Sequence, residues 1–285
     1  MQCISPINIR DPSDPKHRIS VPCGRCYACL SNKRTSWTYR LLQETKHSMT
    51  SKFITLTYDD ANVPLNEMGE MVLSKTDVQL FMKRFRKKIE PFKVRYFYVG
   101  EYGGKFRRPH YHLLLFNYPL NHRDLFADLC GAWSKGNVFV GEVTQASIHY
   151  VAKYVIARMD KDKYVVPPFM RCSNKPGIGS QWLTPAMKAF AAREYGVVVP
   201  MPAGYKCAMP RYYRDKIYTT QAEKDIVRMK NLQKSDEMLK QAYEADKSYM
   251  DAFGGDHSAY TTSVIRDQIR KGNKLLKDLN NDFEL

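Results

Sequence analysis

Two histidines separated by one residue, His110 and His112, form the first group whose types and spacing indicate chemistry. The residues around them, 110–116, are rich in apolar and aromatic side chains and predict a strand. Side chains at positions i and i+2 of a strand project from the same face, so both imidazoles should point the same way. Two such histidines can hold one divalent cation if a third ligand completes the site, although an ordinary exposed strand is the alternative interpretation.

Glu101 is the candidate third ligand because it ends another predicted strand, residues 93–101. A turn-forming loop, residues 102–109, joins the two strands, and we expect them to form a hairpin. If Glu101 pairs with His110, its carboxylate lies on the face of both imidazoles, whereas a slip of one residue moves it to the other face. A mixed oxygen and nitrogen site with open positions suits Mg²⁺ or Mn²⁺.

A pair of tyrosines, Tyr150 and Tyr154, lies in a predicted helix over residues 145–159. At about 100° per residue, the two phenols are roughly 40° apart and about 135° from the centre of the apolar stripe. We therefore expect them off the core face, where they either perform chemistry or cover a neighbouring surface. Lys153 is placed to lower a phenol pKa or to hold a phosphate. The apolar stripe consists of Ile148, Val151, Ala152, Val155 and Met159.

The metal ligands and the tyrosines together indicate phosphoryl transfer to tyrosine. A metal ion would polarise the scissile phosphate and stabilise the leaving oxygen. A tyrosine oxygen would attack in line and form a phosphotyrosine bond, which conserves the energy needed to rejoin the strand without ATP. A second tyrosine on the same helix face would allow a second cleavage before the first product is released.

The cysteines form a second candidate metal site. The chain has seven cysteines, an odd number that does not suit a disulfide framework. Four-coordinate structural zinc is the favoured interpretation, with unliganded thiols and an iron–sulfur cluster as alternatives. The expected ligands are Cys3, Cys23, Cys26 and Cys29, and the expected packing residues are Cys130, Cys172 and Cys207.

The elements that must position these groups predict an α+β fold, with a mainly antiparallel sheet and flanking helices. We expect three parts: a Cys-rich N-terminal element and helix (1–48), a central domain (49–219) and a charged helical tail (220–285). The chain after residue 160 is expected to be rich in loops until the tail. Further predicted helices cover residues 33–46, 74–90, 123–133, 220–250 and 258–280, and further strands cover 52–58 and 138–143.

The charge and hydropathy of the chain indicate which classes of molecule it can bind. The 285 residues carry a net charge of +16, and residues 1–219 hold 34 basic against 17 acidic side chains. This excess of positive charge in residues 1–219 attracts polyanions, of which nucleic acid is the commonest. The segment 74–108, which is both basic and rich in aromatic residues, suits single-stranded nucleic acid. No stretch approaches the roughly 18–20 apolar residues that span a bilayer, and the N-terminus lacks a secretory signal. We therefore expect a soluble intracellular protein without a membrane partner.

The order of these motifs resembles the HUH endonuclease superfamily, and more closely the replication initiators of microviruses of the gokushovirus type. The resemblance covers roughly residues 1–215. The motifs that carry it are Met1-Gln-Cys3, Pro22-Cys-Gly-Arg-Cys-Tyr-Ala-Cys29, Phe53-Ile-Thr-Leu-Thr-Tyr58, Gly100-Glu-Tyr-Gly103, Arg108-Pro-His-Tyr-His112, Tyr150-Val-Ala-Lys-Tyr-Val155, Lys175-Pro-Gly-Ile-Gly179 and Pro210-Arg-Tyr-Tyr213.

The resemblance implies an HUH/RRM-like endonuclease domain, with a mainly antiparallel five-stranded sheet, that initiates rolling-circle replication. Such an initiator nicks origin DNA through a 5′-phosphotyrosine link, leaves a 3′-hydroxyl for a host polymerase and later circularises the displaced single strand. Tyr150 and Tyr154 match the nucleophiles, His110 and His112 match the metal ligands, and Glu101 matches the third ligand. The implied partners are single-stranded and origin DNA and a host helicase and polymerase, in the cytoplasm of an infected bacterium.

Two other interpretations remain open at this point. One is a plasmid initiator or transposase of the same chemistry. The other is a non-catalytic protein that binds RNA or single-stranded DNA through an RRM-like sheet and a zinc knuckle. The tyrosine pair distinguishes the second from an enzyme, because a binding module does not need it.

Overall fold

The structure is a computed structural model, and it contains two compact units. It describes residues 3–281 except 4, 12–13, 15, 17, 105, 120–123, 157–164, 203, 246, 248–250, 252–253 and 255. One unit comprises Met1–Ser36 with Thr184–Lys277, and the other comprises Trp37–Leu183 with Asp278–Leu285. Helix α1 (Tyr27–His47) contributes to both units, and the expected boundaries at residues 48 and 219 stay predictions.

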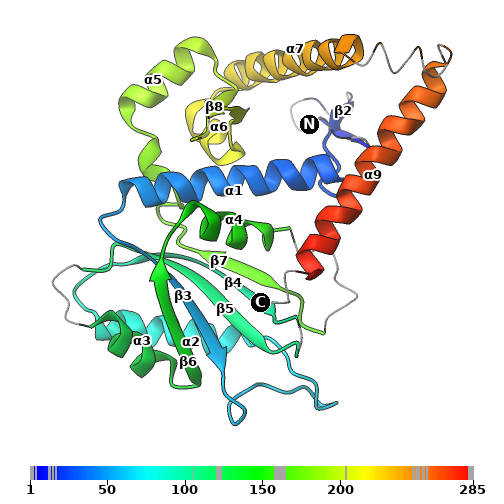
Figure 1. The fold of residues 1–285 in the computed structure, drawn as a ribbon. Coiled ribbons are helices and arrows are strands. Elements are labelled where there is room, and N and C mark those ends of the chain that lie inside the picture. Colours follow the sequence, from blue (N-terminus) through cyan, green and yellow to red (C-terminus); the bar gives the residue numbers. More distant parts are fainter. Residues whose placement is uncertain are drawn as a thin grey trace. The chain divides into compact units, whose positions relative to one another are not determined.

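A five-stranded antiparallel sheet forms the centre of the second unit (Figure 1). Its strand order is β6-β3-β5-β4-β7, and the strands are β3 (Ser51–Tyr58), β4 (Arg95–Tyr102), β5 (Pro109–Phe116), β6 (Gly136–Glu142) and β7 (Phe169–Cys172). The α+β class and the number of strands are confirmed. The position of β7 was not predicted, because prolines on both sides of this short segment indicate loops. It forms a strand by pairing with residues 97–100 of β4.

Helices α2 (Lys75–Lys88) and α3 (Leu125–Trp133) cover one face of this sheet. The predicted start of α2 is confirmed, since the Ser74 side chain accepts a hydrogen bond from the Asp77 backbone N–H. Apolar residues at helical spacing then face the sheet. Those that are buried are Val78, Phe81, Met82 and Phe85. Burial of each such side chain contributes about 1.5–3 kcal/mol, which fixes this face of the sheet as a closed core.

Helix α4 (Gln145–Lys153) covers the other face, together with the part of α1 that belongs to this unit. A capping box formed by Thr144 and Ser147 begins α4, but the helix ends at Lys153 with Tyr154 as its C-cap. The prediction that it extends to Met159 is therefore wrong at its end, and Met159 lies outside the described residues. Helix α1 begins at Tyr27, ahead of the predicted Lys33.

The first unit contains two small hairpins and several helices. The hairpins, β1 (Ile7–Arg10) with β2 (Arg18–Val21) and β8 (Val198–Pro200) with β9 (Lys206–Ala208), were not predicted. Helices α5 (Pro185–Glu194) and α6 (Arg211–Ile217) fall in a region expected to be loops. The two charged tail helices are confirmed as α7 (Gln221–Ala245) and α9 (His257–Asn281). Among the described helices, none is both long and apolar enough to cross a bilayer.

Candidate functional site

The hairpin of β4 and β5 has the register that the metal-site hypothesis requires. Glu101 pairs directly with His110, and His112 pairs with Val99 on one side and Thr55 on the other. Residues that oppose one another across a ladder share a face of the sheet. The carboxylate and both imidazoles therefore lie on the face that α4 covers.

Glu101 Oε1 is the atom on which this site converges. His110 Nε2 lies 2.9 Å from it, and His112 Nε2 lies 2.6 Å from it. The three side chains offer ligand atoms that all lie within 4.8 Å of one another. Such a cluster brings two nitrogens and a carboxylate oxygen to one point, as a divalent cation requires.

Two atoms of the cluster have unused hydrogen-bonding capacity. Glu101 is only 1% exposed, and its Oε2 is buried without a hydrogen-bond partner among the described residues. His112 Nε2 is likewise buried without a hydrogen bond of good geometry, although it lies close to Oε1. Buried polar atoms are almost always satisfied in proteins. A cation held by Glu101, His110 and His112 would satisfy both atoms, so the residues fit a metal.

The other ring nitrogens are held by neighbours, which leaves Nε2 of each histidine facing the cluster. His112 Nδ1 lies 3.0 Å from Thr55 Oγ1, and His110 Nδ1 lies 3.1 Å from the Arg108 carbonyl oxygen. Such outer contacts orient metal-binding imidazoles and select their tautomer. Thr55 was not identified from the sequence, because its role depends on the β3–β5 register.

Electrostatics favours the ligating forms of Glu101 and His112, whereas without a cation it favours the protonated form of His110. Burial acts to raise the pKa of Glu101, but the hydrogen bond with His110 and the close approach of His112 lower it to about 2. Burial lowers the pKa of His112. Burial acts in the same direction on His110, but its hydrogen bond to Glu101 raises the pKa overall. An ionised carboxylate and a neutral imidazole are the ligating forms of these groups.

The tyrosines of α4 are connected to the cluster by hydrogen bonds. The Tyr150 hydroxyl donates to Glu101 Oε1 at 3.0 Å, and the Tyr154 hydroxyl donates to the Tyr150 hydroxyl at 3.0 Å. Lys153 Nζ lies 4.6 Å from the centre of the Tyr150 ring and 5.3 Å from that of Tyr154. The structure therefore brings together every residue predicted for the sheet-and-helix site.

The expectation that both tyrosines lie off the core face is wrong for Tyr154. This residue is 3% exposed and belongs to the core between α4 and the sheet, against which Tyr150 also packs. The expectation assumed a helix with one solvent-facing side, whereas α4 also buries Lys153, which lies outside the apolar stripe. Burial, with the nearby Glu101 carboxylate, raises the pKa of Tyr154.

On the opposite face of the sheet, hydrogen bonds of Tyr111 with Ser74 and Tyr58 fix the position of β5. The Tyr111 hydroxyl donates to the Ser74 carbonyl oxygen at 2.7 Å and accepts from the Ser74 N–H at 3.0 Å. The Tyr58 hydroxyl lies 2.9 Å from that of Tyr111. Gly100 makes room for this ring, since a Cβ there would lie 3.1 Å from it. The sequence signal for this role of Tyr111 is its position between the two histidines, which places its side chain on the other face of the strand.

The segment Lys175–Gly179 is anchored by a buried ion pair. Glu44 in α1 pairs with Arg95 in β4, and Glu44 Oε2 also accepts a hydrogen bond from the Gly179 N–H at 2.6 Å. Arg95 donates to the carbonyl oxygens of Pro176 and Gly177. This motif therefore joins α1 to the sheet rather than contributing ligands to the site.

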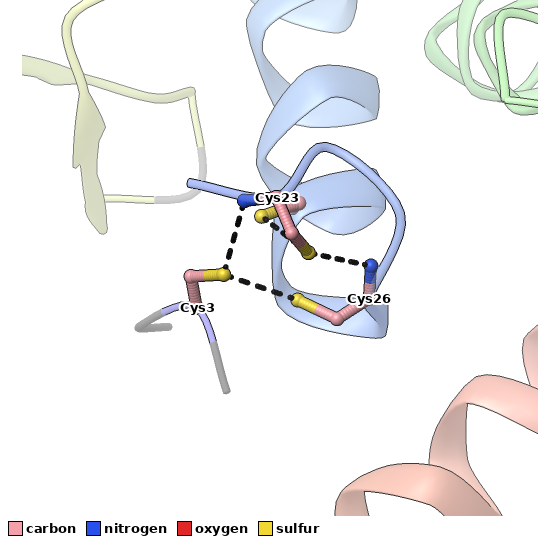
Figure 2. A group of neighbouring side chains, drawn as sticks. Cys3, Cys23 and Cys26 are labelled. Atoms are coloured by element: carbon pink, nitrogen blue, oxygen red, sulfur yellow. Dashed lines mark hydrogen bonds between the residues drawn. The ribbon is translucent and has the colours of Figure 1, made fainter. Parts of the chain in front are cut away.

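The four expected cysteine ligands gather in the first unit, and Figure 2 labels three of them, Cys3, Cys23 and Cys26. Cys26 Sγ lies 3.8 Å from Cys3 Sγ, and Cys23 Sγ lies 4.0 Å from Cys29 Sγ. These separations exceed a disulfide bond, which is about 2.05 Å. Four thiolates bound about 2.3 Å from a zinc ion stand roughly 3.8 Å apart at the corners of a tetrahedron, which matches the observed spacing.

Backbone N–H groups also point at these sulfurs. The Cys23 N–H donates to Cys3 Sγ at 3.2 Å, and the Arg25 and Cys26 N–H groups donate to Cys23 Sγ at 3.4 and 3.3 Å. Such bonds stabilise negative charge on sulfur, so the residues fit a thiolate-bound metal. The other cysteines, Cys130, Cys172 and Cys207, are free and partly buried.

The basic segment lies mainly on α2, away from the metal ligands. Lys83, Arg86 and Lys87 are exposed, and they line a surface hollow with Tyr96 and Tyr98 of β4. The Arg86 guanidinium lies 4.9 Å from the centre of the Tyr96 ring. The predicted interleaving of cations and aromatic rings is therefore present, while its use for single-stranded nucleic acid stays a prediction.

Fold and site together define an α+β protein in which a carboxylate and two histidines of an antiparallel sheet face two tyrosines of a covering helix. Residues 51–159, which contain all of these side chains, match the family model of the replication-associated protein ORF2. The chain belongs to this family of replication-associated proteins, and the resemblance to microvirus proteins is confirmed. No solved structure matches.

Three curated relatives come from bacterial viruses. The replication-associated protein VP4 of Bdellovibrio phage phiMH2K is 30% identical over 219 residues, which are 69% of this chain and 67% of that protein. The replication-associated protein ORF2 of Spiroplasma virus 4 is 29% identical, over 68% of this chain and 66% of that protein. The replication-associated protein ORF4 of Chlamydia phage 1 is 25% identical, over 68% of this chain and 53% of that protein.

Proposed function

We propose that this protein is an HUH-type nicking and joining endonuclease that initiates rolling-circle replication of phage DNA. The observation that carries the proposal is the hydrogen bond from the Tyr150 hydroxyl to Glu101 Oε1, which puts a nucleophile beside the metal ligands. A protein that only binds RNA or single-stranded DNA has no use for that arrangement. Family membership supports a role in replication, because the relatives are named as replication-associated proteins of phages.

Glu101, His110 and His112 would hold the catalytic Mg²⁺ or Mn²⁺. When bound, the ion supplies Lewis-acid polarisation of the scissile phosphate and charge stabilisation for the leaving oxygen. The Tyr150 oxygen attacks phosphorus, the phenol proton is released, and the bond from phosphorus to the 3′ oxygen breaks. The leaving oxygen takes a proton and becomes the 3′-hydroxyl, while the 5′ phosphate stays on tyrosine.

The two tyrosines differ in their position relative to the ligands, and this supports an order of use. Tyr150 contacts Glu101 directly and is only partly buried. Tyr154 is more deeply buried and reaches the ligands through the Tyr150 hydroxyl. We therefore assign the first cleavage to Tyr150 and the second, which releases and circularises the displaced strand, to Tyr154. Lys153 would contribute positive charge beside both rings.

Other components follow from the same proposal. Origin DNA and single-stranded DNA are the substrates, a host polymerase extends the 3′-hydroxyl and a host helicase separates the strands, all in the cytoplasm of the infected bacterium. Cys3, Cys23, Cys26 and Cys29 would bind structural zinc, because their sulfur spacing fits a zinc tetrahedron better than free thiols or a disulfide.

Cleavage of DNA by the two tyrosine variants tests the proposal. Single-stranded oligonucleotides that tile the DNA encoding this protein are incubated with it and Mn²⁺, with EDTA as the control. We expect one cleaved sequence, no first cleavage with Tyr150→Phe, and first cleavage without strand joining with Tyr154→Phe. Absence of cleavage of every oligonucleotide with any divalent metal would overturn the enzymatic function and favour the binding protein.

A further inference from the structure

The face of the sheet that carries the metal ligands continues onto the edge strand β6. Phe139 of β6 pairs with Thr55 of β3, and Thr55 lies 3.0 Å from His112 Nδ1 through its hydroxyl. Paired residues share a face of the sheet. The Phe139 side chain therefore projects from the same surface as His112, on the side of the site where the sheet ends.

The Phe139 ring is exposed and extends over the neighbouring Gly141 of its own strand. It is 63% exposed, although the histidines and Glu101 on the same face are mostly buried. A Cβ at position 141 would lie 3.3 Å from Phe139 Cε1, so the ring rests above Gly141, which has no side chain. The absence of a side chain at Gly141 leaves room for this edge of the ring, and most of the side chain remains open to solvent.

This ring is close enough to the metal ligands to contact the same DNA strand. Phe139 and His112 lie on strands that are separated by β3 alone, and a strand spacing of about 4.8 Å puts them roughly 10 Å apart. Stacked nucleotides of one DNA strand advance about 3.4 Å each, so roughly 10 Å corresponds to about three nucleotides, and fewer in an unstacked strand.

We propose that Phe139 is a stacking platform for a base of single-stranded DNA, within a few nucleotides of the phosphate that is cleaved. The proposal rests on the proposed function, which places that phosphate at Glu101, His110 and His112. An aromatic face accepts any base, because every base presents a π-surface. Phe139 would thus hold the strand in line with the tyrosines without selecting its sequence.

Exposed aromatic side chains are common, and two other roles would explain this one. The ring could merely cover Gly141 and stabilise β6. It could also form a contact between two copies of the chain, because β6 is an edge strand. Only the stacking role requires the ring to contact a base.

Tryptophan at this position provides a direct measurement of stacking. Phe139→Trp is titrated with a thymidine oligonucleotide in EDTA, which prevents cleavage, while fluorescence anisotropy of a labelled oligonucleotide reports binding. We expect saturable quenching of the new tryptophan that parallels binding. Phe126→Trp is the matched control, because Phe126 is 53% exposed on α3, which covers the other face of the sheet. It should show no quenching.

The contribution of the Phe139 ring to the affinity for single-stranded DNA is measured with Phe139→Leu and the control Phe126→Leu. Loss of one stacked base should weaken binding by roughly 5- to 150-fold. In the oligonucleotide that is cleaved, one abasic position within about three nucleotides of the cleaved phosphate should weaken wild-type binding by a similar factor and should have no further effect on Phe139→Leu. Thermal unfolding of both variants is measured alongside, so that loss of β6 is recognised.

Three results would overturn the proposal: no binding of single-stranded DNA, binding without quenching at position 139, or equal losses in the two leucine variants. Self-association of the wild-type protein that Phe139→Leu abolishes would assign the ring to a contact between copies. The experiments distinguish failure of the stacking proposal from failure of the proposed nuclease function. Cleavage with no effect at Phe139 removes only the platform, whereas quenching without cleavage by any metal removes only the nuclease.

Discussion

Three side chains approach one oxygen of Glu101, and two of them are imidazoles. The negative charge of this carboxylate is therefore what makes the cluster attractive to a cation. Glu101→Gln retains the shape of the side chain but replaces one oxygen with an amide that donates hydrogen bonds. We expect Mn²⁺ affinity to fall at least about tenfold, as loss of groups that support metal sites typically does.

Isothermal titration with Mn²⁺ measures this effect without DNA. Glu142→Gln is the matched control, because Glu142 is a largely exposed carboxylate on β6 that pairs with Lys52. Its removal should leave Mn²⁺ affinity unchanged. Unchanged affinity in Glu101→Gln, or an equal loss in both variants, would show that the three residues are not the metal ligands.

At the scale of secondary-structure elements, the position of β5 depends on the Tyr111 hydroxyl. That group both donates to and accepts from the backbone of Ser74, immediately before α2. Tyr111→Phe removes both hydrogen bonds and leaves buried polar groups unsatisfied, which should reduce the free energy of unfolding by about 1–3 kcal/mol. Chemical denaturation measures this change.

The control for that measurement is Tyr96→Phe. Tyr96 stacks on Tyr98 on the same face of β4, and its hydroxyl forms no hydrogen bond among the described residues. This variant should unfold at the same denaturant concentration as the wild-type protein. If the two variants were equally stable, the contact between β5 and the start of α2 would contribute little to holding the histidine strand.

The elements that were predictable are those whose signals are local. The alternation in His110 and His112 follows from strand geometry, and the Ser74 cap begins α2 as its sequence indicates. The Glu101–His110 pairing could only be posed as a condition, because several registers suit a loop of that length. The burial of Tyr154 and the strand β7 were not predictable, since each depends on what packs against it.

At the scale of the whole molecule, the two candidate metal sites belong to different units and differ in ligand type. Sulfur ligands in the first unit suit zinc, whereas oxygen and nitrogen ligands in the second suit Mg²⁺ or Mn²⁺. We expect purified protein to contain one equivalent of zinc that survives dialysis against Mg²⁺. Elemental analysis by mass spectrometry measures it.

Cys26→Ser should lose this zinc and become more sensitive to proteolysis, because metal binding by Cys3, Cys23, Cys26 and Cys29 stabilises the folded N-terminal element. Cys130→Ser should retain zinc, since Cys130 is a free, partly buried cysteine on α3 outside the cluster. Stoichiometric iron instead of zinc, or zinc that is retained in Cys26→Ser, would contradict the assignment.

Peptide mapping shows directly whether Tyr150 or Tyr154 becomes joined to DNA. The protein is reacted with its cleaved oligonucleotide and Mn²⁺, denatured and digested with protease and nuclease, and the residual nucleotide is located by tandem mass spectrometry. We predict a 5′-phosphate link on Tyr150 in the first cleavage, with Tyr154 modified only when Tyr150 is already occupied. A link to any residue outside this pair, or DNA cleavage that leaves no covalent link, would contradict the account.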